Sequence, residues 1–249
     1  EENHMYIRIA SNDFFAISQD VVSKMIAGEY DAEQAYRVFN AQLLAEEKPD
    51  TSETVLTSET AYSNVFHKDG GNASFSVMAN TLRGIYGSDV LVAAANSFTG
   101  SVLQADYTKA TARAMIMSNG LRAYHATMTG AELKDTLHAF VEGCEDGFTP
   151  FNRGSLPVVS GIAVQVQEND GGYALTGVTR NGQPLRDDDT VTVTCLATEK
   201  QMAPLLQDET HAFERGEETV KNTWGDAVSS GSVALAAPES YITLGGGVK

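Results

Sequence analysis

The most informative stretch for the architecture is TMTGAELKDTLHAF, residues 127–140. It predicts the end of a strand, a Thr-Gly turn and an amphipathic helix whose Thr129 and Glu132 have the spacing of a capping box. The apolar residues that recur at helical spacing and predict its buried face are Leu133, Leu137, Phe140 and Val141. Gly143 predicts the end of the helix. This unit carries no catalytic group, so any function must be inferred from the sequence on either side of it.

Helices and strands are also predicted before this unit. Residues 74–86 place apolar side chains on one face of a helix, and residues 89–95, DVLVAAA, form an apolar run short enough for a buried strand. Residues 110–117 predict a further helix, and residues 121–128 predict the strand that enters the Thr-Gly turn.

Strands dominate the part that follows. Residues 158–167, 173–179 and 191–197 alternate or run apolar, and Gly-containing turns between them indicate antiparallel hairpins. A last helix is expected from Glu217 to Val228, and a closing strand at residues 240–244. Because helices and strands occur in blocks, the predicted class is α+β, with antiparallel or mixed sheets flanked by helices.

The N-terminal segment differs from the rest of the chain in its predicted structure. Residues 1–50 predict a helical hairpin and a polar linker, in which Asp31 and Gln34 have capping-box spacing, ahead of a main domain at residues 51–249. Residues 18–43 also resemble the closing helices of solute-binding lipoproteins, so this boundary is provisional.

The charge and hydropathy of the sequence exclude some classes of function. The 17 Lys and Arg against 33 Asp and Glu give a net charge of −16, which argues against a nucleic-acid surface and against docking on anionic lipid. No apolar run approaches the roughly 18 residues of a membrane span, so no membrane insertion is expected. Cys144 and Cys195 could form a disulfide or remain two buried thiols.

Four sequence patterns follow one another along the chain. No single pattern is specific to one family, but the order in which the four occur is informative. They are DVLVAAANSFTGSV (89–102), TMTGAELKDTL (127–137), SGIAVQV (160–166) and NGQPLRDDDTVTVTCLAT (181–198). In this order they resemble the C-terminal domain of the bacterial 5′-nucleotidases, a family that includes UDP-sugar hydrolases and cyclic-phosphodiesterase relatives. The resemblance covers roughly residues 55–245.

The resemblance implies a two-domain enzyme. In the family, an upstream metallophosphatase domain holds a pair of divalent metal ions that activate water, and the C-terminal domain grips the nucleoside and phosphate. In this chain the histidines are scattered singly, without ligand spacing, at His4, His67, His125, His138 and His211. We therefore expect no catalytic residue, metal ligand or cofactor in this chain, and no hydrolysis by it alone.

The candidate substrate-binding residues come from turns where the sequence departs from the family pattern. The residues are Asn96, Ser97, Thr99, Asn119, Arg122 and Leu156. The first three replace a family turn that contains an Arg, the next two lie in or after the counterpart of a second turn, and Leu156 replaces a base-stacking aromatic. A nucleotide or nucleoside is the expected ligand. Since a stacked base contributes roughly 1–3 kcal/mol, these losses weaken nucleotide selectivity.

Other candidates have simpler interpretations. Arg153 and Arg180 are interpreted as surface residues, and Trp224 as a core residue of the last helix. His125 and His138 are interpreted as structural or exposed histidines. The acidic run Asp187-Asp188-Asp189, which could suggest a cation site, is interpreted as a solvated hairpin turn.

Two functions remain in competition. The first is the substrate-recognition domain of an exported, extracellular or cell-surface bacterial hydrolase of the 5′-nucleotidase type. The second is a non-enzymatic ligand-binding or adhesive module that kept the scaffold and lost nucleotide specificity.

Overall fold

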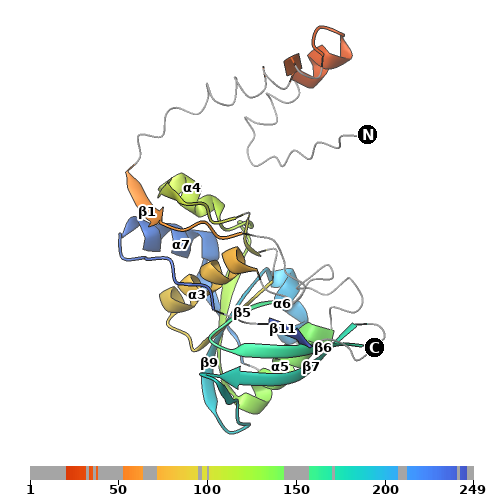
Figure 1. Ribbon diagram of the computed structural model, residues 1–249, viewed down its shortest axis with the longest axis vertical. Coiled ribbons are helices and arrows are strands. Elements are labelled where there is room, and N and C mark those ends of the chain that lie inside the picture. The colour runs from red at the N-terminus through yellow and green to blue at the C-terminus, as the bar shows by residue number, and fades with distance from the viewer. Residues whose placement is uncertain are drawn as a thin grey trace. The chain divides into compact units, whose positions relative to one another are not determined.

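Figure 1 presents a computed structural model of the protein. The residues that it describes are 21–31, 34, 35, 38, 53–63, 72–94, 97–99, 101–142, 157–169, 172–206, 212–239 and 242–245. The chain divides into two compact units, residues 1–52 and 53–249.

The described part of the first unit contains a helix at residues 21–26. The backbone N–H of Asp31 donates to Gln34 Oε1 at 3.1 Å, and the N–H of Gln34 donates to Asp31 Oδ1 at 2.7 Å. This reciprocal pair confirms the predicted capping box. Much of the predicted helical hairpin lies outside the described residues.

A mixed five-stranded sheet forms the centre of the second unit. Its strand order is β10-β4-β9-β2-β5. The strands are β2 (Val90–Ala93), β4 (Arg122–Thr129), β5 (Val158–Ser160), β9 (Thr190–Ala197) and β10 (Glu214–Thr219). β2 and β9 run parallel, and the other neighbours run antiparallel.

Two smaller sheets complete the strands of this unit. A four-stranded sheet has the order β11-β6-β7-β8, in which β11 runs parallel to β6. Its strands are β6 (Ala163–Asn169), β7 (Gly172–Arg180), β8 (Gln183–Pro184) and β11 (Ile242–Gly245). β1 (Thr54–Ser58) and β3 (Ala105–Thr108) form an antiparallel pair.

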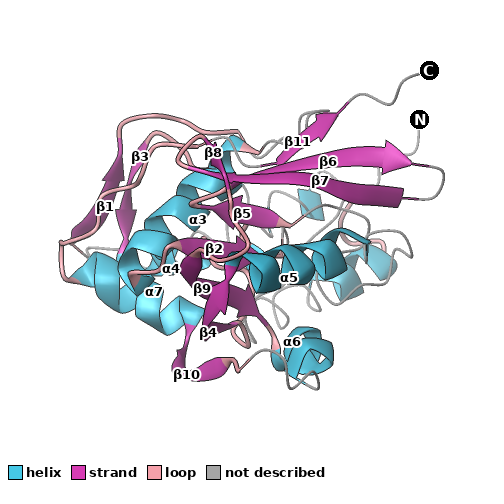
Figure 2. Cartoon of the chain, turned by 90° about the horizontal axis from the view of Figure 1, so that it is seen from below, coloured by secondary structure: helices cyan, strands magenta, loops and turns pink. Residues whose placement is uncertain are grey.

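Helices cover both faces of the five-stranded sheet (Figure 2). One face carries α3 (Ala73–Tyr86) and α7 (Val220–Ser229), and the other carries α5 (Gly130–Glu142) and α6 (Glu199–Leu206). α4 (Lys109–Ala114) packs against α7 and the β1–β3 pair. Successive strand residues point to opposite faces, so Val92 and Cys195 join the core beneath α5, whereas Leu91 and Leu196 join the core beneath α3. Cys195 is fully buried, which raises the pKa of its thiol to about 12, and Cys144 lies outside the described residues.

The Thr-Gly turn behaves as its sequence predicts. Glu132 accepts from the Thr129 N–H at 2.7 Å, and Thr129 Oγ1 accepts from the Glu132 N–H at 3.3 Å, which confirms the capping box. Gly130 donates its N–H to the Asp189 carbonyl at 2.7 Å. α5 therefore begins directly against the turn between β8 and β9.

The structure corrects the prediction of one strand at residues 158–167. The chain breaks at Gly161, whose φ is +84°, so that β5 and β6 belong to different sheets. A Cβ at Gly161 would lie 2.0 Å from the Asp89 carbonyl oxygen, so the bend needs glycine. Alternating apolar residues continue across the bend, and the sequence pattern therefore conceals it.

Two further boundaries differ from the prediction. The expected helix at residues 217–228 begins only at Val220, because the residues before it pair with β4 as strand β10. The expected closing strand is present as β11, and residues 240–241 lie outside the described part. The mixed sheets and flanking helices confirm the α+β class.

Candidate functional site

Four strand ends meet at one edge of the five-stranded sheet. Ala93, at the end of β2, pairs with Leu196 near the end of β9 and with Val158 at the start of β5. Arg122, at the start of β4, pairs with Ala197. We call residues 97–99, 118–122 and 198–201 around these ends the loop edge. The topology therefore brings together the described turns that contain Ser97, Thr99, Asn119 and Arg122.

Ser97 lies in the turn after β2. Its backbone N–H donates to the Ala94 carbonyl at 2.9 Å, and its carbonyl accepts from the Met117 N–H at 3.0 Å. The residue is only 1% exposed, and its hydroxyl has no hydrogen-bond partner among the described residues. A buried hydroxyl of this kind is costly unless something completes it. Asn96, its predicted neighbour in the site, lies outside the described residues.

Three other predicted site residues are bound within the chain. The Thr99 hydroxyl donates to the Ala114 carbonyl, and Asn119 Oδ1 accepts from Lys221 Nζ at 3.0 Å. The Arg122 guanidinium donates through Nη1 to the Glu217 carbonyl. These bonds fix the side chains in place and occupy part of their bonding capacity. Leu156 lies outside the described residues.

Sequence reasoning missed α6, which begins at the loop edge. The Thr198 N–H donates to Gln201 Oε1 at 2.8 Å, and the Gln201 N–H donates to Thr198 Oγ1 at 3.4 Å. This is a capping box, and the Thr-x-x-Gln spacing that precedes an apolar residue was the available signal.

A pocket of about 280 Å³ lies beyond the end of α3 and includes His125 and Thr194. His125 Nδ1 lies 3.0 Å from Thr194 Oγ1, and the imidazole and the Tyr86 ring have centroids 5.5 Å apart. Burial lowers the pKa of His125, and the nearby Glu214 carboxylate opposes the shift. The structural interpretation of this histidine is therefore consistent with its contacts.

The lowered pKa of His125 makes a prediction for stability against pH. The unfolded chain takes up a proton near pH 6.5, whereas the folded protein takes it up only at lower pH. We expect the contribution of His125 to the free energy of unfolding to fall as the pH drops below about 6.5, and to level off below its folded pKa. Urea unfolding at successive pH values measures it. An unchanged slope in His125→Gln would contradict the assignment.

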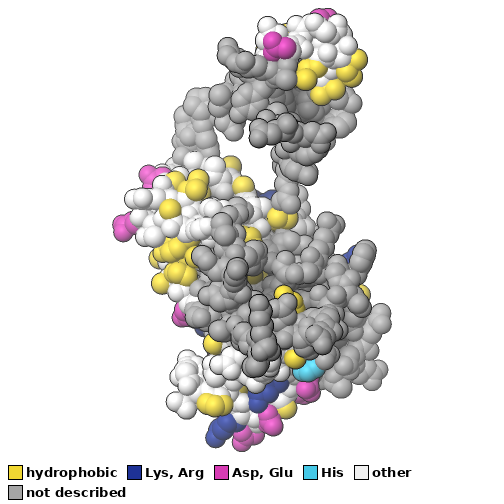
Figure 3. All heavy atoms as spheres, turned by 45° about the vertical axis from the view of Figure 1, so that its right-hand side comes forward, with side chains coloured by type: hydrophobic (Ala, Val, Ile, Leu, Met, Phe, Trp, Pro, Cys, Tyr) yellow, Lys and Arg dark blue, Asp and Glu magenta, His cyan; other side chains and the backbone are white. Residues whose placement is uncertain are grey.

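The acidic run is a solvated turn tied to neighbouring cations. Lys134 Nζ lies 2.7 Å from Asp187, and Arg186 Nη2 lies 2.9 Å from Asp189. The backbone N–H of Arg186 and then its side chain lower the pKa of the Asp189 carboxyl. Charged side chains of both signs lie near one another at the lower end of Figure 3. Within the described ranges, no three His, Cys, Asp or Glu side chains group as a metal site would require.

Comparisons with known proteins give the fold a context. No protein-family model and no curated protein matches the sequence. Among solved structures, the Haemophilus influenzae NAD nucleotidase is similar at a TM-score of 0.59 and 17% identity, over 86% of this chain and 41% of that one. A 5′-nucleotidase precursor from Thermus thermophilus has a TM-score of 0.58 and 11% identity, over 86% and 43%.

A third similar structure is the sulfate thiohydrolase SoxB of Thermus thermophilus, with a TM-score of 0.59 and 17% identity, over 86% of this chain and 39% of that one. The chain thus spans about two fifths of the length of each of these proteins. The similarity confirms the predicted fold, that of 5′-nucleotidase family structures at low sequence identity. In the described part of the chain, no helix is long and apolar enough to cross a bilayer.

Proposed function

We propose that this chain is the substrate-recognition part of a 5′-nucleotidase-like phosphoester hydrolase that acts in extracellular nucleotide catabolism at a bacterial surface. The proposal rests on one observation: the turn after β2, the turn before β4 and the start of α6 come together at the loop edge. Two proteins with this fold are named for nucleotide or NAD cleavage. Export of the chain is part of the proposal.

Recognition at the loop edge would use few groups. Only Nη1 of Arg122 has a partner among the described residues, so its other N–H groups are available for a phosphate oxygen. The buried Ser97 hydroxyl could complete its bonding with a ligand. We assign no bond cleavage to these residues.

The hydrolytic chemistry is proposed to come from an upstream metallophosphatase domain with two divalent metal ions, which would activate the attacking water. The described residues offer no donor cluster that fits such a pair. No step in this chain is therefore assigned to metal chemistry.

A thermal-unfolding screen with nucleosides, nucleoside 5′-monophosphates and UDP-sugars tests the proposal. A ligand at 100 times its dissociation constant stabilises the folded state by about 2.7 kcal/mol, which raises the melting temperature. We expect Arg122→Gln to lose most of the response to monophosphates and to keep the response to nucleosides. Arg186→Gln, which alters an exposed arginine away from the loop edge, should respond like the wild type. No response to any nucleotide or nucleoside would overturn the proposal.

The second candidate function, a non-enzymatic binding or adhesive module, is favoured by the internal bonds of three site residues. Thr99, Asn119 and Arg122 each have a partner within the chain. Indifference to the whole nucleotide panel, together with binding of an unrelated ligand, would favour this alternative.

A further inference from the structure

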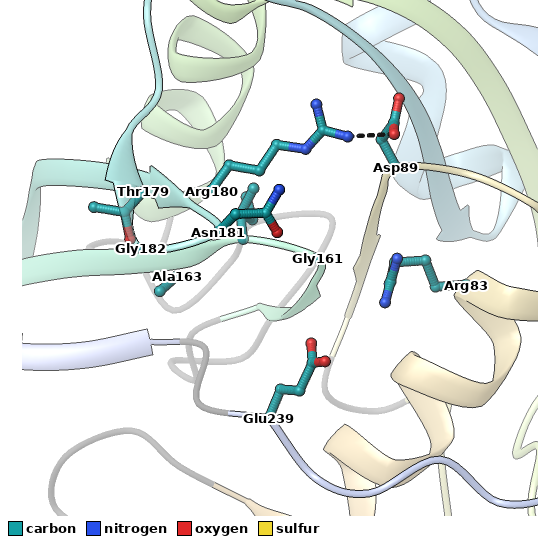
Figure 4. Close-up of a pocket in the computed structure, with 10 residues that line it drawn as sticks. Arg83, Asp89, Gly161, Ala163, Thr179, Arg180, Asn181, Gly182 and Glu239 are labelled. Carbon is teal, nitrogen blue, oxygen red and sulfur yellow. Dashed lines mark hydrogen bonds and ion pairs between the residues drawn. The ribbon is translucent and has the colours of Figure 1, made fainter.

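A second pocket lies at the opposite end of β2 from the loop edge, and we call it the Arg83 pocket. Its volume is about 320 Å³, near the lower limit for small-molecule sites. Figure 4 shows Arg83 extending from α3, Arg180 from the end of β7 and Glu239 from the segment after α7 around the same space. Asp89, directly before β2, also lines it.

Arg83 is held in place by a chain of buried and partly buried hydrogen bonds. Its Nε–H donates to Ser160 Oγ at 2.9 Å, and the Ser160 hydroxyl, in a residue with 0% exposure, donates to Asn80 Oδ1. Asn80 Nδ2 then donates to the Ala237 carbonyl at 2.7 Å. The terminal nitrogens of Arg83 have no partner among the described residues. The chain thus orients a guanidinium and leaves its fork available.

The other arginine of the pocket is already neutralised. Arg180 Nη2 forms an ion pair with Asp89 Oδ1. Asp89 Oδ2 accepts from the backbone N–H of Thr192 at 2.9 Å and from the Thr192 hydroxyl at 3.1 Å. The Thr192 N–H is the main cause that lowers the pKa of Asp89, and Arg180 adds to it. This carboxylate is therefore ionised and committed to its partners.

Glu239 supplies the remaining charge. Its backbone N–H and carbonyl both bond to Ser76 Oγ at 3.3 Å, which fixes the residue against α3. Its carboxylate has no partner in the described part of the chain. The pocket consequently holds one cation and one anion without counter-ions among the described residues, Arg83 and Glu239, besides the pair formed by Arg180 and Asp89.

We propose that the Arg83 pocket binds a small zwitterion such as a free α-amino acid, with its carboxylate on Arg83 and its ammonium group on Glu239. A guanidinium fork binds a carboxylate through parallel N–H bonds. The charges of the lining side chains sum to zero, so a neutral zwitterion preserves the balance. A phosphate dianion would instead meet the carboxylates of Glu239 and Asp89. This site is separate from the loop edge and from the proposed nucleotide function.

Titration of the full chain with glycine, N-acetylglycine, methylamine and inorganic phosphate, followed by NMR, tests the proposal. We expect glycine to bind most tightly, since N-acetylglycine lacks the ammonium group and methylamine lacks the carboxylate. Arg83→Gln should weaken glycine binding by about tenfold or more, as expected for loss of a charge-assisted pair. Glu239→Gln, at an exposed position, should weaken glycine binding and strengthen N-acetylglycine binding.

Arg186→Gln is the matched control, because Arg186 is exposed and lies outside the pocket. The unfolding midpoint of each variant shows whether it is folded. If Arg83→Gln does not fold, Glu239→Gln alone tests the site. Phosphate or N-acetylglycine binding as tightly as glycine would overturn the proposal. So would unchanged glycine affinity in Glu239→Gln, or no saturable binding of any probe. None of these results depends on whether nucleotides bind at the loop edge.

Discussion

Gly130→Ala should destabilise the protein by about 3 kcal/mol or more, within the range of severe single substitutions. A Cβ at this position would lie 1.9 Å from the Arg186 carbonyl oxygen, which is backbone and cannot rotate away. To relieve the contact, α5 must separate from the turn between β8 and β9. That movement breaks the bonds from the N–H groups of Gly130 and Ala131 to the carbonyls of Asp189 and Asp187, at 2.7 and 3.1 Å.

Gly84→Ala provides the matched control for this prediction. Gly84 is exposed in α3, and a Cβ there would meet nothing within 4 Å. Because alanine is favoured over glycine in helices by about 1 kcal/mol, this variant should be as stable as the wild type or more stable. Urea unfolding of the three proteins measures both effects. Equal stability of Gly130→Ala and the wild type would show that α5 does not begin against this turn.

Trp224→Ala should cost about 3–5 kcal/mol, as removal of a large buried ring does in other cores. Trp224 lies on α7, has 0% exposure and packs in the core beneath α3. Its indole N–H donates to the Ala112 carbonyl at 2.7 Å. These contacts confirm its interpretation as a core residue. The bond also ties α7 to α4, so the loss affects both helices.

Trp224→Phe separates the two contributions. It keeps most of the apolar volume but removes the indole donor, while the Ala112 carbonyl still accepts from the Met115 N–H at 3.1 Å, so the expected cost is about 1 kcal/mol. Circular dichroism during urea unfolding measures both variants, because Trp224 is the only tryptophan and its fluorescence disappears with it. A Trp224→Ala protein as stable as the wild type would contradict the buried position.

Local patterns were sufficient for the elements whose signals lie close together in sequence. The Thr129–Glu132 capping box and the apolar run at β2 predicted α5 and the buried strand. The bend at Gly161 was missed because it depends on the close approach of Asp89, which lies far away in sequence. A regular alternation of residue types cannot reveal that one strand becomes two.

For the candidate site, too, the sequence predicted some features and not others. The order of strands and turns predicted where Ser97 and Arg122 would lie, but not what their side chains contact. Arg122 bonds to Glu217, 95 residues later, and Asn119 bonds to Lys221, 102 residues later. Such partners follow only from the folded chain.

The Arg83 pocket was outside the reach of the sequence for the same physical reason. Its charged groups come from four separate segments, and each arginine alone resembles a surface residue. Arg180 was interpreted in that way, yet its side chain is 30% exposed and paired with Asp89. The interpretation was incomplete because the partner lies 91 residues earlier.

The most direct test of nucleotide recognition at the loop edge is an NMR titration of the labelled full chain with a nucleoside 5′-monophosphate. We predict saturable shifts of the backbone amides of Ser97, Asn119, Arg122 and Thr198, whereas the amide of Gly161 in the Arg83 pocket stays unchanged. Saturable shifts confined to other surfaces, or none at any ligand concentration, would show that the loop edge does not recognise nucleotides.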